Sequence, residues 1–124
     1  MALLGDAAHP TLQYMAQGAC MAMEDAVCLS HEMAARPGDP EAALEAYRRQ
    51  RVLRTARIQL MSRAVGDHIY HPAGAHAALR NAIMSAKSDA EWYDTLAWLY
   101  GGTGLSESQA AAAGVGARQA TTAA

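Results

Sequence analysis

Apolar and small side chains recur at three- and four-residue steps through most of the chain, which is the spacing of one face of an α-helix. The first such stretch predicts a helix over residues 18–35, ended by the Arg-Pro-Gly sequence that follows it. A second stretch predicts a helix over residues 40–65, with Asp39 as its N-cap. The two faces consist of Ala19, Met23, Ala26, Ser30 and Met33 in the first helix and of Leu53, Ala56, Leu60, Met61 and Ala64 in the second.

Two shorter helices are predicted farther along the chain. One covers residues 73–86, after a connector at 67–72. The other begins at Ser88, because Ser88 and Glu91 have the spacing of a capping box. Its apolar residues are Trp92, Leu96 and Leu99, and a Gly-Gly pair at 101–102 ends it.

The first six residues have a different pattern, an apolar run that leads into Gly5 and Asp6. This pattern predicts the end of a buried strand followed by a turn. A strand this short is unstable without neighbours, and the rest of the chain supplies none. We therefore expect a mainly α structure with a vestigial strand at its N-terminus. The apolar helix faces would lack a partner in the isolated chain, as in the C-terminal piece of a larger protein.

Composition and net charge further restrict the ordered region of the chain and its possible functions. Residues 103–124 are almost devoid of large apolar side chains, which predicts a disordered tail after an ordered region over 1–102. The net charge of −2 argues against nucleic-acid binding. No apolar run reaches the roughly 18–20 residues of a membrane span. There is no secretory signal at the N-terminus, so we expect a cytoplasmic protein with free thiols at Cys20 and Cys28.

Two further clusters of polar residues have simple explanations. Asp67, His68, His71 and His76 match no zinc signature, and Pro72 breaks any single helical face, so no metal site is predicted. Five arginines stand close together in the second helix, where a solvated face or the contact of a homodimer is preferred over a nucleic-acid surface. They are Arg48, Arg49, Arg51, Arg54 and Arg57.

The segment from Gly5 to Ala19 holds the chemistry that the sequence suggests. Asp6 at the carboxyl end of a strand can accept hydrogen bonds from ligand hydroxyls. Gly18 allows close approach of the backbone, and the N–H groups that open the next helix favour an electron-rich or anionic atom. These features suit a cofactor with a polyol chain and an electron-accepting ring. The alternative is a surface turn with an ordinary N-cap.

The sequences Gly5-Asp-Ala-Ala-His9-Pro, Gln17-Gly and Glu24-Asp-Ala resemble the second flavin-binding motif of the FAD-dependent aromatic hydroxylases of the para-hydroxybenzoate hydroxylase class. The resemblance implies an α/β FAD-binding fold of which this chain is a helical segment. It also implies that Asp6, beside Gly5, bonds the ribityl chain of FAD. The backbone of Ala16, Gln17, Gly18 and Ala19 would face the pyrimidine end of the flavin. Ala16 stands where the family commonly has glycine, and Cys20 where it has asparagine.

Gln13-Tyr14, followed by Ala16-Gln17-Gly18-Ala19-Cys20, is similar to the 3-hydroxybenzoate 6-hydroxylase subgroup, and the likeness extends more loosely to residue 102. It implies hydroxylation of a small phenolic acid, 3-hydroxybenzoate to gentisate, with FAD, NAD(P)H and oxygen. Gln13, Tyr14 and Gln17 are then the candidates to orient the substrate, with Gln17 first. His9 is expected to be a structural hydrogen-bonding residue.

A non-enzymatic function remains as the alternative. A small helical interaction module could assemble through the Met- and Ala-rich face, and it would fold cooperatively by itself without flavin. The hydroxylase hypothesis instead requires further parts that this sequence does not contain, among them a Gly-rich βαβ unit and a sheet over the substrate.

Overall fold

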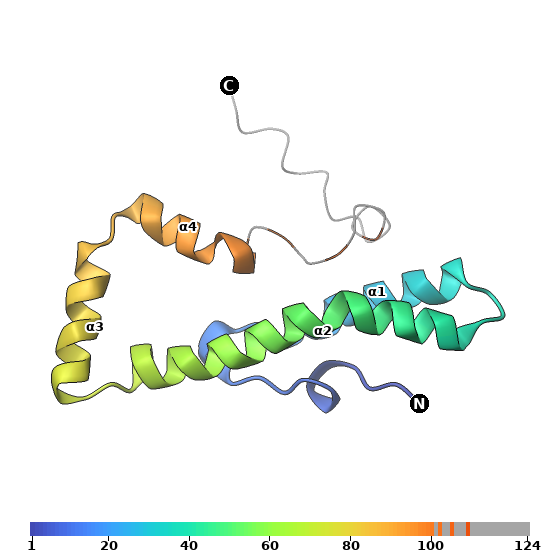
Figure 1. Cartoon of the computed structure of the whole chain (residues 1–124), viewed down its shortest axis with the longest axis horizontal. Helices are drawn as coiled ribbons and strands as arrows, with labels where there is room; N and C mark the ends of the chain where they lie inside the picture. Colours follow the sequence, from blue (N-terminus) through green and yellow to red (C-terminus); the bar gives the residue numbers. More distant parts are fainter. Residues whose placement is uncertain (101, 103–104, 106–108, 110–124) are drawn as a thin grey trace, which may run out of the picture.

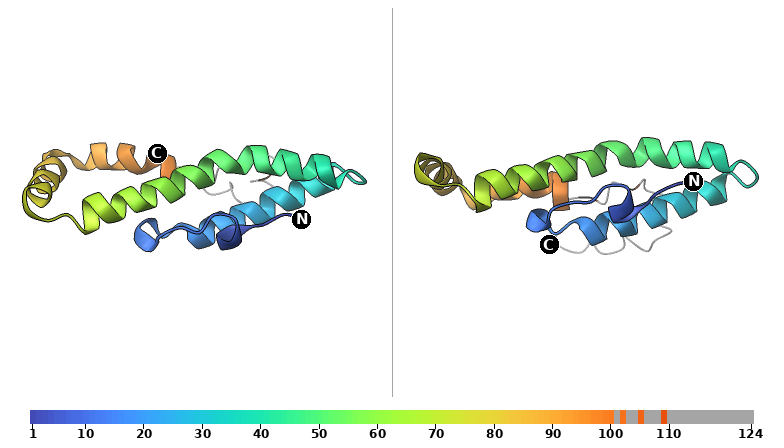
Figure 2. Two further views of the ribbon diagram at one scale, coloured as in Figure 1. Left: turned by 60° about the horizontal axis from the view of Figure 1, so that its bottom comes forward. Right: turned by 90° about the horizontal axis from the view of Figure 1, so that it is seen from below.

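Two long antiparallel helices form a hairpin along which the N-terminal segment lies (Figures 1 and 2). The computed structural model describes residues 1–100, 102, 105 and 109. A third helix runs across the open end of the hairpin, and a fourth returns alongside the second. The elements are the 3-10 turns η1 (Gly5–Ala7) and η2 (Gln13–Met15), the helices α1 (Gly18–Ala35) and α2 (Pro40–Val65), the π-helical turn η3 (Gly66–Tyr70), and the helices α3 (Gly74–Ala86) and α4 (Asp89–Tyr100).

The helix boundaries follow the capping signals of the sequence. Asp39 Oδ1 accepts the N–H of Ala42 at 2.9 Å, with Pro40 in the first helical position of α2. At α4, Glu91 Oε2 accepts the N–H of Ser88 at 2.8 Å. The predicted bounds of the two long helices are confirmed, and the two shorter helices begin one residue later than predicted.

The expected strand at the N-terminus is wrong for the described residues, none of which is in a strand. Leu4 has extended dihedrals (φ −132°, ψ 160°), but the chain enters the η1 turn at Gly5. Leu3, which the strand would bury, is 52% exposed. The reason is that an extended segment needs a neighbouring strand for its hydrogen bonds, and the described elements are all helices and turns.

The predicted apolar faces of α1 and α2 point largely outward. Leu53 is 79% exposed, Leu60 65% and Met23 62%. The interior of the hairpin is instead mixed, with a small core of Met15, Met21, Ile58 and Leu99 beside buried polar side chains. The buried polar residues among those described are His9, Gln17, Glu24, Asp25, Glu32, Arg51, Thr55, Ser62 and Gln109.

Other predictions have mixed outcomes. Cys20 and Cys28 are both free, as predicted, and burial raises the pKa of the Cys28 thiol. None of the described helices combines the length and apolar character that crossing a membrane requires.

The predicted tail over 103–124 lies almost wholly outside the described residues. Within it, Gln109 is buried and donates to Gln50 Oε1 at 2.9 Å.

Candidate functional site

The Gly5–Asp6 turn is fixed closely against α1. Gly5 has a positive φ of 55°, and a Cβ added to it would lie 3.1 Å from the Cβ of Ala22. Its N–H donates to Asp25 Oδ2 at 3.0 Å. Gly5 therefore supplies both the backbone conformation and the close approach that bring this turn onto the helix.

Asp6 lies at the N-terminal end of α1, beside Gly18. A Cβ added to Gly18 would stand 3.7 Å from Asp6 Oδ1 and 3.7 Å from Thr11 Oγ1. Asp6 is exposed, and within the described part of the chain its carboxylate has no hydrogen bond or ion pair. The N-cap residue Gln17 makes no side-chain cap, so the N–H groups of Gly18 and Ala19 stay open to a ligand. One carboxylate acceptor and two backbone donors thus lie at the same helix start.

Ala16 adopts the left-handed conformation, with φ 53° and ψ 32°, between η2 and α1. An L-residue is strained in this region by about 1–2 kcal/mol, whereas glycine is not. The structure therefore explains why glycine suits this position and why alanine here carries a cost.

We expect Ala16→Gly to raise the free energy of unfolding of the chain by about 0.5–1 kcal/mol, the relieved strain less the greater freedom of glycine in the unfolded state. Ala26→Gly, on the exposed side of α1, is the matched control and should lower it by about 1 kcal/mol. Thermal unfolding followed by circular dichroism measures both. Equal destabilisation by the two substitutions would contradict the strain at Ala16.

The loop between η1 and α1 is held by one face of α2. Gln59 Nε2 donates to the carbonyl of Pro10 at 3.1 Å, and Ser62 Oγ donates to the carbonyl of Leu12 at 2.6 Å. These two residues of α2 are three positions apart and so share a helix face. The conformation of the loop is consequently set by α2 as well as by its own sequence.

Tyr14 closes the same loop against the π-helical turn η3. Its hydroxyl is hydrogen-bonded to His71 Nε2 at 2.8 Å, and its ring centroid lies 5.1 Å from that of Tyr70. The ring also covers Gly66, where an added Cβ would come within 2.4 Å of Tyr14 Cε2. The absence of a side chain at Gly66 is what admits the tyrosine.

Gly66→Ala should lower the free energy of unfolding by about 1–3 kcal/mol, because the new methyl group overlaps the Tyr14 ring. In a Tyr14→Ala background the overlap is gone, and the same substitution should stabilise by up to about 1 kcal/mol, since Gly66 has helical dihedrals. Urea titration of the four proteins tests this reversal of sign. Destabilisation of similar size in both backgrounds would show that Tyr14 does not occupy the space above Gly66.

The three residues predicted to orient a substrate have unlike surroundings. Gln13 is exposed, Tyr14 is half-buried with its hydroxyl engaged by His71, and Gln17 is only 6% exposed. Their part in binding a substrate stays a prediction. His71 is the residue that sequence reasoning missed here, since 57 positions separate it from Tyr14.

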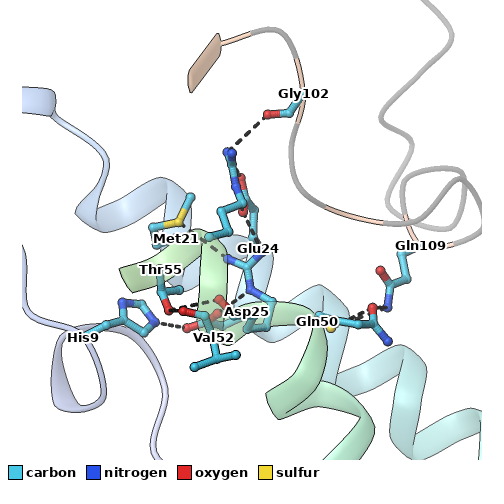
Figure 3. A network of polar contacts seen from close by, with 12 residues as sticks. His9, Met21, Glu24, Asp25, Gln50, Val52, Thr55, Gly102 and Gln109 are labelled. Carbon is cyan, nitrogen blue, oxygen red and sulfur yellow. Dashed lines mark hydrogen bonds and ion pairs between the residues drawn. The ribbon is translucent and has the colours of Figure 1, made fainter. Parts of the chain in front are cut away.

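Asp25 is fully buried at the junction of the turn, α1 and α2 (Figure 3). Besides the N–H of Gly5, it accepts His9 Nε2 at 2.5 Å and Arg51 Nε at 2.8 Å. Burial alone would raise the pKa of Asp25, but the hydrogen bonds from Arg51, Gly5 and His9 and the Arg51 charge hold it below its usual value. The expected structural role of His9 is confirmed.

Glu24 extends this buried network toward α4. It pairs with Arg51 Nη1 at 2.8 Å and with Arg54 through two hydrogen bonds of 2.9 Å each. Arg54 also donates to the carbonyl oxygens of Trp98 at 3.4 Å and Gly102 at 3.2 Å. The network therefore ties the turn, both long helices and the end of α4 together.

The expectation of a solvated arginine face is correct for Arg48 and Arg49, whose side chains are exposed and pair with Glu45. It is wrong for Arg51, which is 3% exposed, and for Arg54, whose side chain is 14% exposed. The physical reason is that buried carboxylates on α1 compensate both charges. The signal in the sequence was the acidic pair at 24–25 on the inner side of α1.

The residues His68, His71 and His76 do not gather with Asp67 into a ligand set. The rings of His68 and His76 lie 5.2 Å apart. Across the residues that the structure describes, no three His, Cys, Asp or Glu side chains are arranged to hold a metal ion.

Comparison with known proteins decides how this site is interpreted. The chain is 54% identical over 99 residues to 3-hydroxybenzoate 6-hydroxylase 1 of Aquipseudomonas alcaligenes, a match that covers 80% of this chain and 25% of that protein. It is 52% identical over 99 residues to the 3-hydroxybenzoate 6-hydroxylase of Polaromonas naphthalenivorans strain CJ2, covering 80% and 24%. The chain thus aligns with one segment of proteins that are named 3-hydroxybenzoate 6-hydroxylase.

More distant hydroxylases extend the comparison. The chain is 43% identical over 101 residues to 3-amino-4-hydroxybenzoate 2-monooxygenase of Streptomyces cremeus, covering 82% of this chain and 25% of that protein. It spans about a quarter of the length of the curated hydroxylases it matches. No family profile matches the chain, and no solved structure matches it.

Proposed function

We propose that this chain is the C-terminal, FAD-binding segment of a flavoprotein monooxygenase that hydroxylates a small phenolic acid, converting 3-hydroxybenzoate to gentisate with NAD(P)H and oxygen. The observation that carries the proposal is the 48–54% identity to four proteins named 3-hydroxybenzoate 6-hydroxylase, over 80% of this chain. A further relative, from Mycolicibacterium vanbaalenii, is named an FAD-dependent urate hydroxylase and is 46% identical over 63 residues.

The geometry around Asp6 fits FAD. An exposed carboxylate without a partner among the described residues can accept hydrogen bonds from the hydroxyls of a ribityl chain. The open N–H groups of Gly18 and Ala19 can donate to the pyrimidine end of the flavin, where the field of α1 favours negative charge. Gln17 is buried directly at this helix start, next to the glycine that permits close approach.

When bound, FAD supplies the redox chemistry between NAD(P)H, oxygen and the ring. The residues of this chain bind and orient. A phenolate donates electron density to its ortho and para carbons, so selectivity for the para carbon depends on which carbon the pocket holds in place. Gln13, Tyr14 and Gln17 are proposed to hydrogen-bond the phenol or carboxylate and so fix that orientation.

The outward apolar faces of α1 and α2 support a segment that packs against further parts of a larger protein. The alternative of a small interaction module would also expose such a face, but the named relatives favour the enzyme. A cytoplasmic location and a homodimer stay predictions.

A segment exchange tests the proposal. This chain replaces the matching segment of the Aquipseudomonas alcaligenes enzyme, and the chimera is assayed with FAD, NADH or NADPH, oxygen and the three hydroxybenzoate isomers. The control places the corresponding segment of the Streptomyces cremeus monooxygenase in the same frame. We expect retained FAD in the first chimera and gentisate from the 3-isomer, with a higher kcat/KM than in the control.

Each part of the proposal has its own contradicting outcome. A correctly folded chimera that retains no FAD would overturn the cofactor assignment. Retained FAD without gentisate, or with no advantage over the control segment, would overturn the substrate assignment. Catechol from the 2-isomer would place the segment with salicylate hydroxylases instead.

A further inference from the structure

The buried carboxylate of Asp25, on α1, accepts hydrogen bonds from two other parts of the chain. Gly5 and His9 belong to the N-terminal segment, and Arg51 belongs to α2. The contacts measure 3.0, 2.5 and 2.8 Å respectively. Figure 3 shows His9 beside Asp25. No other described side chain hydrogen-bonds the backbone of the Gly5–Asp6 turn.

Such a junction is an inefficient way to stabilise a fold. Removing a carboxylate and a guanidinium from water costs several kcal/mol per ion, and a well-packed apolar set of equal volume is often as stable. A second polar cluster of the same hairpin, at Glu32 and Gln50, stabilises the α1–α2 contact without reaching the turn. Asp25 differs from that cluster because the placement of its carboxylate oxygens fixes the position of the Gly5–Asp6 turn.

The two carboxylate oxygens of Asp25 accept hydrogen bonds from different residues. Oδ2 accepts from the Gly5 N–H and from His9 Nε2, while Oδ1 accepts from Arg51 Nε. Since a carboxylate only accepts, His9 carries its proton on Nε2 in this arrangement. An asparagine amide of the same shape offers one acceptor and one donor, so it must turn a donor toward either Arg51 or the turn.

We propose that Asp25 is a positioning residue for FAD, which sets the Gly5–Asp6 turn so that the Asp6 carboxylate lies beside Gly18 at the start of α1. His9 and Arg51 orient the Asp25 carboxylate for this role. The inference rests on the proposed function, because it concerns the site at which Asp6 would bind the cofactor. Asp25 acts through Asp6 and makes no contact with the cofactor itself.

The test measures FAD binding to the chimera by flavin fluorescence. Asp25→Asn should raise the dissociation constant of FAD by about tenfold or more, since misplacing Asp6 forfeits a charge-assisted hydrogen bond. Glu32→Gln is the matched control, because Glu32 is 5% exposed in the same helix pair and bonds Gln50 at 2.6 Å. It should lower the unfolding temperature of the apoprotein yet change FAD affinity less than about twofold.

A double variant separates positioning from general loss of structure. If Asp25 acts through Asp6, then Asp6→Ala combined with Asp25→Asn should bind FAD no more weakly than Asp6→Ala alone. Additive losses would overturn the proposal. So would an Asp25→Asn chimera that loses stability but keeps the FAD affinity of the unsubstituted chimera.

Two substitutions at His9 keep the proposal testable where Asp25→Asn does not fold. His9→Gln retains a side-chain N–H for Asp25 Oδ2 and should keep FAD affinity, whereas His9→Phe removes that donor and should weaken it. Equal affinities in the two variants would count against the proposal. An unsubstituted chimera that binds no FAD would instead contradict the proposed function, so the two failures are distinct.

Discussion

Replacing Arg51 by methionine is expected to lower the free energy of unfolding by about 3–5 kcal/mol, the range found when one partner of a buried ion pair is removed. Arg51 is 3% exposed and bonds both Asp25 and Glu24. Methionine preserves most of the volume, so the loss reports the uncompensated carboxylates. Urea titration of the chain monitored by circular dichroism measures the change.

The pH dependence of the stability lost in Arg51→Met identifies the cause of that loss. The pKa of Asp25 is lowered from its usual 3.8, so the carboxylate contributes stability above that pH and loses it as the pH falls through the folded value. Without Arg51, the largest contribution that opposes the effect of burial is lost, and the pKa of Asp25 rises. The deficit of Arg51→Met should therefore shrink as the pH falls from about 7 toward about 4.

Arg48→Met is the control for this prediction. Arg48 is exposed on the same helix and pairs with Glu45 at 2.7 Å, where solvent screens the charges. It should change the unfolding midpoint little at any of these pH values. A similar effect of the two arginine substitutions, or a deficit at Arg51 that grows in acid, would argue against the buried network.

The helices could be predicted because their ends depend on local chemistry. Asp39 with the N–H of Ala42, and Ser88 with Glu91, are contacts between residues three apart. The strand could not be predicted correctly for the opposite reason. Its formation depends on a neighbouring strand, and the apolar run at the N-terminus is compatible with either outcome.

The direction of the helix faces was harder to predict than the helices. Periodicity shows that Met23 and Leu53 share faces with other apolar side chains, but it does not show what those faces contact. The opposite faces are buried here because Asp25 and Arg51, 26 residues apart, neutralise each other. Charged residues are usually exposed, so five arginines in one helix suggested solvent.

In the candidate site, too, contacts between residues near in the sequence could be predicted and contacts between distant segments could not. The sequence assigns Asp6 and Gly18 to one cofactor-binding segment, and the structure places them close together at the start of α1. The supports of the loop between them come from distant segments. Ser62 holds the carbonyl of Leu12 and His71 holds Tyr14, and no short motif links these pairs.

In the chimera, Asp6→Ala should weaken FAD binding by about ten- to a hundredfold, which corresponds to the 1.5–3 kcal/mol of a charge-assisted hydrogen bond. Asp6 is exposed and without a partner among the described residues, so its removal should cost the protein itself little stability. Asp6→Asn should lose less affinity than Asp6→Ala, because the amide oxygen still accepts a hydrogen bond. Fluorescence titration of the apoprotein with FAD gives the constants.

Asp39→Ala is the matched control, since Asp39 is also an aspartate at a helix start but serves as the N-cap of α2. That substitution should cost about 0.5–2 kcal/mol of stability and leave FAD affinity unchanged. The two substitutions should thus have opposite effects. Asp6→Ala should lower FAD affinity with little change in stability, and Asp39→Ala should lower stability with no change in FAD affinity. Unchanged FAD retention in Asp6→Ala would refute the assignment of the turn to the cofactor, because no other described side chain offers a free carboxylate beside Gly18.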